Sequence, residues 1–197
     1  MIDEKTNAYY LSLLRERLKD RRFQHSLNVA DAAVMLAKRF GADEEKAYIA
    51  GLLHDITKNE TDENQLQILQ SGGIMLTVTQ QNNPKLWHAM SGMVYLRDTL
   101  GITDQEILGA VRWHTTGKAG MTLLEKVVFI ADYISAERDY PDVDVMRRLS
   151  ETSLDAAALY ALKYSLRTLS EKEKPICEDS VAYYNELIIG KRKDRSE

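Results

Sequence analysis

The sequence predicts an all-α protein that folds as a single helical domain. Apolar residues recur at three- and four-residue intervals along most of the chain, whereas the alternation of apolar and polar residues typical of β-strands is almost absent. The 197 residues include three prolines, ten glycines and no Ser/Gly-rich linker, so we expect one domain over residues 1–197. Its core is expected at about residues 20–140, with further helices at about 150–190 packed on it.

Four amphipathic segments in the first third of the chain are predicted to be helices: about residues 10–20, 22–39, 43–58 and 62–70. Gly41 follows the second segment and is a suitable helix stop, because glycine adopts the left-handed conformation without strain. Asp43 is the expected N-cap of the third segment, and the run Ser71-Gly72-Gly73 ends the fourth.

Five more helices are predicted in the rest of the chain, at residues 84–100, 103–114, 122–135, 153–169 and 179–189. Pro84 suits the first turn of a helix, where its missing N–H is not needed. Residues 103–106 (Thr-Asp-Gln-Glu) and 122–125 (Thr-Leu-Leu-Glu) have the pattern of a capping box. Residues 140–142 indicate a turn, and residues 74–79 give no clear signal.

Composition excludes several classes of protein. The formal net charge of −4 argues against a nucleic-acid-binding protein. Cys177 is the only cysteine, so an intrachain disulfide is excluded, as is usual for a protein of the reducing cytoplasm. No apolar run reaches the ~20 residues that a membrane-spanning helix requires. We therefore expect a cytoplasmic protein that contacts neither membrane nor nucleic acid.

The four histidines of the chain lie on four different predicted helices, each beside apolar residues: His25, His54, His88 and His114. His25 shares a stripe with Val29 and Leu36, at positions four and eleven residues later, so it is expected to point into the core. Two isolated acids accompany the histidines. Asp55 follows the apolar end of a helix, and Asp132 lies within the run Val127–Ile134.

These polar residues in apolar surroundings have two interpretations. A single histidine on an apolar helix face is more often a structural residue, and a single buried aspartate more often pairs with an arginine. Four inward histidines together with two isolated acids instead indicate a metal site, because buried charges need compensation. Imidazole and carboxylate ligands without thiolates suit iron, manganese, cobalt or zinc and leave positions open for water.

Four short phrases then give a resemblance to a known family. They are Arg-Phe-Gln-His-Ser at 22–26, His-Asp-Ile-Thr-Lys at 54–58, His-Thr-Thr-Gly at 114–117 and Ala-Asp-Tyr-Ile-Ser at 131–135. The ordered set His25, His54-Asp55 and Asp132 resembles the signature of the HD-domain metal-dependent phosphohydrolases. Within that superfamily, the phrases are similar to the YqeK group, whose members are symmetrical diadenosine tetraphosphate hydrolases. The resemblance covers about residues 10–140.

The resemblance implies both an activity and a metal. A divalent ion, expected to be iron with manganese, cobalt or zinc as alternatives, would be held by four ligands: His25, His54, Asp55 and Asp132. A metal-bound water would attack an inner phosphate of diadenosine tetraphosphate and release two ADP molecules. His88 and His114 match positions that contact the nucleotide phosphates or, in some HD proteins, bind a second ion. Either histidine, if protonated, could serve as the acid for the leaving ADP.

The expected catalytic residues are Asp55, Lys58, His88 and His114. The expected substrate-binding residues are Arg22, Asp55, Lys58, His88, His114, Thr115, Arg138 and Ile176. Lys58 follows Asp55 by three residues, which would place both on one side of a continued helix. Arg138 matches the phosphate-binding arginine of the family, and Arg22 is one turn before His25, although each cation could instead form a salt bridge. Ile176 precedes the last helix, whose first N–H groups could face a ligand.

Two other functions stay open at this point. One is another HD phosphohydrolase, acting on a nucleoside monophosphate, a deoxynucleoside triphosphate or a guanosine tetraphosphate. The other is a nucleotide-sensing module without catalysis. The expected partner is a dinucleoside polyphosphate or nucleoside diphosphate ligand. The family and the tyrosine-rich C-terminal helices also suggest a homodimer.

Overall fold

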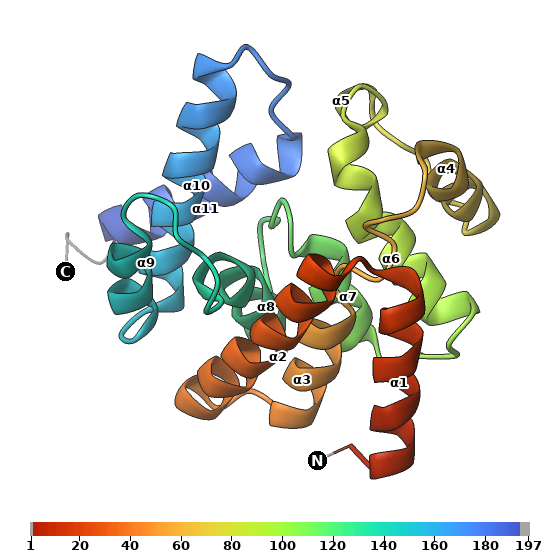
Figure 1. Ribbon diagram of the computed structural model, residues 1–197. Helices are drawn as coiled ribbons and strands as arrows, with labels where there is room; N and C mark the ends of the chain where they lie inside the picture. The colour runs from red at the N-terminus through yellow and green to blue at the C-terminus, as the bar shows by residue number, and fades with distance from the viewer. Residues whose placement is uncertain (1, 194–197) are drawn as a thin grey trace.

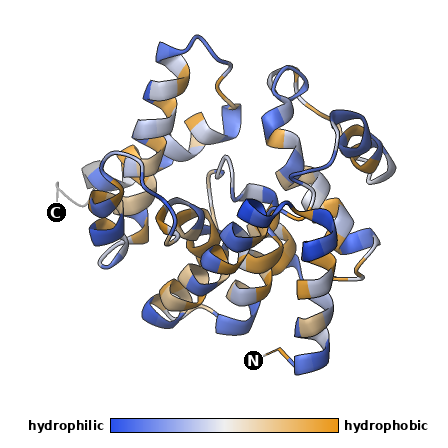
Figure 2. Ribbon diagram, in the orientation of Figure 1, coloured by the Kyte–Doolittle hydropathy of each residue, from blue (hydrophilic) through white to orange (hydrophobic). Residues whose placement is uncertain are grey.

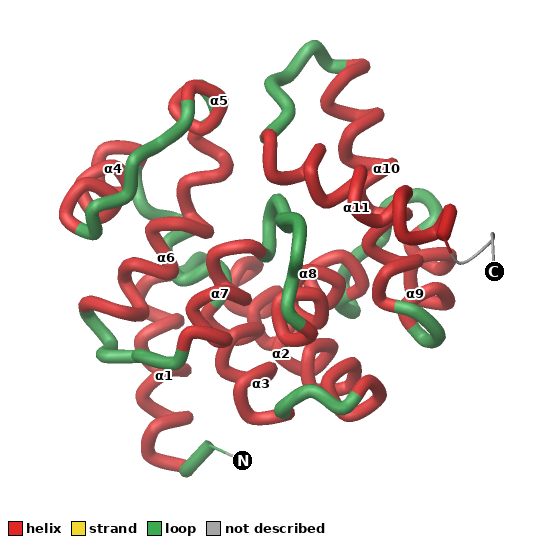
Figure 3. Tube along the Cα trace, turned by 180° about the vertical axis from the view of Figure 1, so that it is seen from behind, coloured by secondary structure: helices red, strands yellow, loops and turns green. Residues whose placement is uncertain are grey.

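Helices make up all the regular secondary structure of residues 2–193, the part of the chain that the computed structural model describes (Figures 1 and 3). The α-helices are α1 (Glu4–Arg17), α2 (Asp20–Phe40), α3 (Glu44–Leu53), α4 (Asp62–Ser71), α5 (Val78–Gln81), α6 (Trp87–Asp98), α7 (Gln105–Trp113), α8 (Leu123–Ile134), α9 (Val143–Ser150), α10 (Leu154–Glu171) and α11 (Glu178–Lys193). A 3-10 turn, η1 (Pro84–Leu86), leads into α6. The all-α prediction is confirmed.

The main hydrophobic core lies where α2, α3, α7 and α8 pack together at the centre of the molecule (Figure 1). Apolar residues concentrate on these inner helices, while polar residues cover the outer ones (Figure 2). The same core includes Leu14 of α1, Phe129 of α8 and Tyr183 of α11, all fully buried. Because one core joins the first helix to the last, we propose that the described residues fold as one domain.

The contact between α2 and α3 depends on a glycine. A Cβ atom added at Gly51 would lie 3.0 Å from the Ala30 Cα and 3.1 Å from the Val29 carbonyl oxygen, both backbone atoms that cannot move aside. Gly41, in the left-handed conformation (φ 78°), ends α2 as predicted and turns the chain back toward α3. Asp43 then caps α3 by accepting from the Lys46 N–H. These features fix α3 closely against α2.

Several helix boundaries differ from the prediction. Helix α1 begins at Glu4 because the Asp3 carboxylate caps it, accepting from the Thr6 N–H. The box at 122–125 is confirmed, but α7 is capped by Asp104 and not by Thr103. Asp104 lies one residue closer to the helix than Thr103. Its carboxylate accepts hydrogen bonds from two N–H groups of the first turn, and these bonds are stronger than those a threonine hydroxyl would accept.

Two short helices were not predicted. Helix α9 (Val143–Ser150) begins directly after the 140–142 turn, and α5 (Val78–Gln81) begins in the segment that gave no clear signal. A capping box between Thr77 and Gln80 stabilises α5, even though the helix has only four residues. Both helices are shorter than the window over which helical periodicity can be recognised.

Two distant parts of the chain meet at one end of the molecule. In Figures 1 and 3, α5 and the turn between α10 and α11 both stand at that end. The Glu178 carboxylate, at the start of α11, accepts hydrogen bonds from the Thr77 and Thr79 hydroxyls. The start of α11 is thereby held beside α5.

Among the described residues, no helix is long and apolar enough to span a membrane.

We expect Gly51→Ala to destabilise the protein by about 1–3 kcal/mol, because the added methyl group overpacks the α2–α3 contact. The free energy of unfolding in urea measures this effect. Gly190→Ala is the matched control, since a Cβ there meets no atom within 4 Å and alanine favours an exposed helix. Equal stabilities of the Gly51→Ala and wild-type proteins would contradict this account of the packing.

Candidate metal and phosphate site

The four histidines and two acids predicted to form a site come together between the central helices. His25 lies on α2, His88 in the first turn of α6, and Asp132 near the end of α8. His54 and His114 are the C-caps of α3 and α7. All four histidines and Asp55 are buried, whereas the Asp132 side chain is 20% exposed.

His54 and His114 end their helices in the same way. The His54 Nδ1 lies 2.7 Å from the Gly51 carbonyl oxygen, and the His114 Nδ1 lies 2.7 Å from that of Val111. Each carbonyl oxygen accepts a hydrogen bond from Nδ1–H, which turns the Nε2 of each ring toward the cluster. The predicted helix 43–58 is wrong beyond Leu53, where α3 ends. The His54 side chain bonds the Gly51 carbonyl oxygen, which in a longer helix would accept from the Asp55 N–H.

One side of the cluster joins His25, His54 and Asp132. The Nε2 atoms of His25 and His54 are 3.3 Å apart. The His25 Nε2 is also 3.0 Å from the Asp132 Oδ1. Asp55 completes this side, with its Oδ2 3.4 Å from the His54 Nε2 and 3.8 Å from the His25 Nε2. The four predicted metal ligands thus form one contiguous group.

The other side of the cluster joins His88 and His114 through the second oxygen of the same carboxylate. The Asp55 Oδ1 is 3.2 Å from the His88 Nε2 and 3.7 Å from the His114 Nε2. The two Nε2 atoms are themselves 3.1 Å apart. The Thr115 hydroxyl lies 3.2 Å from the His88 Nε2 and 3.0 Å from the His114 Nε2. Asp55 is therefore shared between two sets of histidines.

Three cations surround the cluster. The Arg22 Nη1 donates to the Asp55 Oδ2 at 2.7 Å, and the Arg138 guanidinium forms an ion pair with the Asp132 carboxylate. Lys58 reaches His88, with its Nζ 3.0 Å from the Nε2, although α3 does not continue to Lys58. Burial lowers the pKa of Lys58, although the negative charge of Asp55 opposes that shift.

Comparison with known proteins places this geometry in a family. The HD domain family model matches residues 22–137, which include all four histidines and both acids of the cluster. The chain belongs to the HD domain family. This confirms the family inferred from the four phrases of the sequence.

Proteins similar to this one over most of their length carry a specific name. A Bacillus subtilis protein named bis(5'-nucleosyl)-tetraphosphatase, symmetrical, is 39% identical over 91% of this chain and 96% of its own. A Halalkalibacterium halodurans protein of the same name is 38% identical over 91% and 95%. The crystal structure of a predicted HD superfamily hydrolase involved in NAD metabolism, from Clostridium acetobutylicum, has a TM-score of 0.90 and 34% identity. It covers 92% of this chain and 96% of its own.

The residues of this HD domain fit a divalent cation. Although the His88 Nε2 is 3.2 Å away, the buried Asp55 Oδ1 makes no hydrogen bond within the described chain. A buried carboxylate oxygen without a partner is costly, and so are two histidine Nε2 atoms in contact with no proton or cation between them. A cation between them would satisfy both. Three groups of side chains could each hold an ion: His25, His54 and Asp55; His54, His114 and Asp132; and Asp55, His88 and His114.

The two acids are kept ionised by their surroundings, as metal ligands must be. Burial alone would raise the pKa of Asp55, but attraction to the nearby histidines, His54 first, holds it well below its ordinary value. Burial would likewise raise the pKa of Asp132, but the His25 hydrogen bond and the Arg138 charge hold it well below the usual range.

Glu137 belongs to this site but was not predicted. Its carboxylate accepts from the His25 Nδ1–H, and it also accepts from the Ser135 hydroxyl at 2.8 Å and the Asn28 amide at 2.5 Å. Burial would raise the pKa of Glu137, but these bonds lower it to about 2. An acid beside Arg138 was visible in the sequence, but nothing there indicated that it reaches His25.

Thr57 is a second residue that the sequence analysis missed, although it lies inside the quoted phrase at 54–58. Its hydroxyl donates to the His88 carbonyl oxygen at 2.9 Å and lies 2.8 Å from the Ser91 hydroxyl. This contact ties the segment after α3 to the first turn of α6. Thr57 thereby helps to fix the position of Asp55 relative to His88.

Ile176 lies in the segment between α10 and α11, two residues before the start of α11. Its neighbourhood is joined to the histidine cluster through the Ser180 hydroxyl, which donates to the Thr116 carbonyl oxygen at 2.9 Å. Thr116 is two residues after His114. The predicted role of Ile176 in substrate binding stays a prediction.

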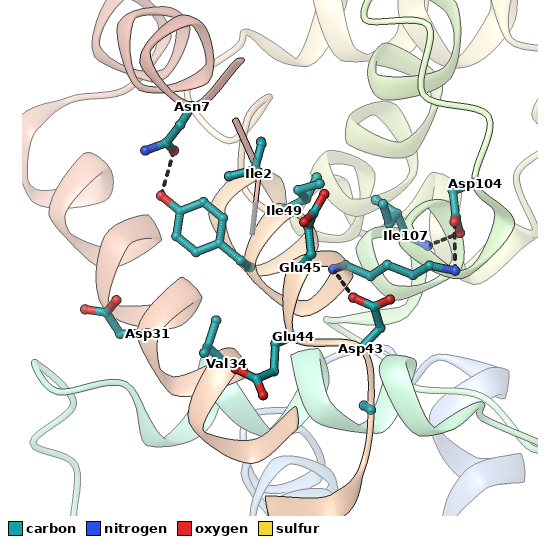
Figure 4. A pocket seen from close by; sticks show the side chains of 13 residues that line it. Ile2, Asn7, Asp31, Val34, Asp43, Glu44, Glu45, Ile49, Asp104 and Ile107 are labelled. Atoms are coloured by element: carbon teal, nitrogen blue, oxygen red, sulfur yellow. Dashed lines mark hydrogen bonds and ion pairs between the residues drawn. The ribbon is translucent and has the colours of Figure 1, made fainter. Parts of the chain in front are cut away.

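A hollow of about 1,040 Å³ lies away from the histidine cluster (Figure 4). It is formed where α1, α2, α3 and the start of α7 meet, and its lining includes Asp31, Asp43, Glu44 and Asp104. The one lysine there, Lys46, pairs with Asp104 and Glu106. An acidic hollow of this kind repels phosphate, so it is a poor candidate for an anionic substrate.

We expect Glu137→Ala to weaken divalent-metal binding about 10- to 100-fold, because His25 loses the partner that orients it. Competition with a chelator measures the affinity without any activity assay. Asp139→Ala is the control, because it removes the same charge from a neighbouring exposed acid that is hydrogen-bonded to no histidine among the described residues. Equal metal affinities for the two variants would show that Glu137 does not orient His25.

Proposed function

We propose that this protein hydrolyses diadenosine tetraphosphate symmetrically to two ADP molecules. The observation that carries the proposal is the buried Asp55, shared between histidine pairs and surrounded by Arg22, Lys58 and Arg138. Such a site combines a place for a divalent ion with cations for phosphate. The names of the Bacillus subtilis and Halalkalibacterium halodurans relatives, similar over more than nine-tenths of this chain, support the substrate.

In the proposed reaction, a water oxygen forms a bond to one inner phosphorus of the tetraphosphate. The bond from that phosphorus to the central bridging oxygen breaks, and the bridging oxygen leaves with the other half. Each product is therefore ADP, and the water proton that is not retained goes to solvent. Cleavage at any other bond would give unequal products.

His25, His54, Asp55 and Asp132 would hold the divalent ion, and iron is the proposed ion, with manganese, cobalt and zinc as alternatives. When bound, such an ion polarises phosphoryl oxygens and lowers the pKa of water. The second group, formed by Asp55, His88 and His114, could hold a second ion instead of contacting phosphate directly. In either case the Nδ1 hydrogen bonds of His25, His54 and His114 orient the rings so that each Nε2 faces the cluster.

The cations provide the charge compensation that phosphoryl transfer needs. Arg22 forms an ion pair with Asp55, and Arg138 forms one with Asp132. Once a divalent ion balances these carboxylates, both guanidinium groups can bind phosphate oxygens instead. Lys58, His88 and Thr115 line the other side. Burial lowers the pKa of His88 well below its ordinary value, so it is neutral at pH 7. We therefore assign His88 to a phosphate contact and not to the role of the acid.

The identity of the products tests this function. Incubation of the metal-loaded protein with diadenosine tetraphosphate, followed by chromatography, is expected to give ADP alone. ATP with AMP would indicate asymmetrical cleavage, and inorganic phosphate would indicate a different HD phosphohydrolase. Tight nucleotide binding without any product would favour a sensing module. A homodimer, a cytoplasmic location and the absence of nucleic-acid and membrane partners stay predictions.

We expect His54→Ala to lose both bound metal and activity, because it removes a buried ligand at the centre of the cluster. Metal analysis of the purified variant, together with its rate of ADP formation, measures both quantities. A variant that kept full activity without metal would contradict the proposed role of the ion.

Lys58→Ala should behave differently. The variant is expected to keep its metal and to lose about 100-fold in kcat, as is usual when one group that stabilises transition-state charge is removed. Metal content and kcat measured on the same preparation separate the two roles. Loss of metal from this variant would show that Lys58 supports the metal ligands and not the substrate.

A further inference from the structure

A second hollow opens directly on the His25 side of the cluster. It has a volume of about 430 Å³ and is formed by the α1–α2 junction, the segment after α3 and the loop that follows α8. Its volume is within the ~300–1,000 Å³ found for small-molecule sites. Its lining includes four cations, Lys19, Arg21, Arg22 and Arg138, and the aromatic ring of Tyr140.

The electrostatics of this cavity favour an anion. Lys19 and Arg21 are exposed, and their side chains make no hydrogen bond or ion pair within the described residues. In contrast, the nearby Arg17 is fully engaged by Glu60 and the Tyr95 hydroxyl. Two acids also line the cavity, but the Glu137 carboxylate is occupied by its hydrogen bonds. Arg22 and Arg138 are paired with Asp55 and Asp132, so Lys19 and Arg21 are the two cations of the lining that are free to meet an anion.

The position of the cavity relative to Asp55 indicates which anion it takes. The Asp55 Oδ2 faces Arg22 and His25, and therefore this cavity, while the Oδ1 faces His88 and His114. The cluster thus has two faces, each lined with its own phosphate-binding groups. A substrate cleaved at its centre has two equal halves that must lie on either side of the reacting phosphorus. If one half contacts His88, the other extends over His25.

We propose that the cavity beside His25 binds the second nucleoside diphosphate half of the substrate, the half that leaves. This inference rests on the proposed function and assigns a subsite within it. Arg22 and Arg138, at the inner end, lie where negative charge develops on the leaving phosphate oxygen. Lys19 and Arg21, at the outer rim, bind the remaining phosphate and ribose oxygens. The Tyr140 ring lines the wall of the cavity, and its hydroxyl donates a hydrogen bond to the Tyr133 carbonyl oxygen, which holds the ring in place.

The test uses the product itself as a probe of both halves. Calorimetric titration of the metal-loaded wild-type protein with ADP is expected to give two ADP molecules per chain. The double variant Lys19→Gln/Arg21→Gln should bind one. It should also lose about tenfold or more in kcat/KM for diadenosine tetraphosphate, since two charge-assisted contacts to phosphate are lost. Both substitutions are on exposed side chains, and circular dichroism of each single variant checks the fold.

Lys38→Gln/Arg148→Gln is the matched control, because it removes the same charge from exposed positions on α2 and α9 outside the cavity. The control is expected to bind two ADP molecules and keep its kcat/KM. If the Lys19/Arg21 variant matched wild type in both measurements while wild type produced ADP, the subsite would be overturned and the proposed function would stand. If wild type cleaved no diadenosine tetraphosphate, the function would fail, and uptake of a single ADP would overturn the subsite as well.

Discussion

The structure depends on the burial of one carboxylate, that of Asp55. Its removal from water is unfavourable unless opposite charge or hydrogen-bond donors replace the water. Helices α2, α3, α6 and α7 each bring a histidine or cation to it, and α8 brings the second acid, Asp132. The packing of α3 on α2 through Gly51 therefore has a functional consequence, since it sets the distance between His25 and the His54-Asp55 pair.

Orientation of the imidazoles is the second constraint, and backbone carbonyls provide most of it. His54 and His114 each end a helix and each donate to a carbonyl oxygen three residues earlier. Helix ends leave such carbonyls without partners, so the ligands are oriented at little cost in other hydrogen bonds. His25 lies within α2, where the carbonyls are already used, and its partner is the side chain of Glu137. The loop after α8 thus contributes Glu137, which bonds His25, and Arg138, which pairs with Asp132.

Much of this arrangement followed from the sequence. The all-α class and most helices could be predicted because their apolar stripes are long, and the clustering of the histidines could be predicted because each had an apolar face beside it. The end of α3 at Leu53 could not, because it depends on a side chain bonding to its own helix. Glu137 could not either, since it contacts a residue more than one hundred positions away, and local pattern carries no information on such a contact. The short helices α5 and α9 fall below the length at which periodicity is visible.

The central claim is that the Asp55 cluster is built to hold a divalent ion, and equilibrium unfolding tests it most directly. An ion that binds only the folded protein stabilises it by about 2.7 kcal/mol at a free concentration about 100 times its Kd. The wild-type protein, stripped of metal, should therefore show a rising urea midpoint as iron, manganese, cobalt or zinc is added. The same titration of Asp55→Asn should show a much smaller rise. A wild-type midpoint that none of these ions raises would contradict the account.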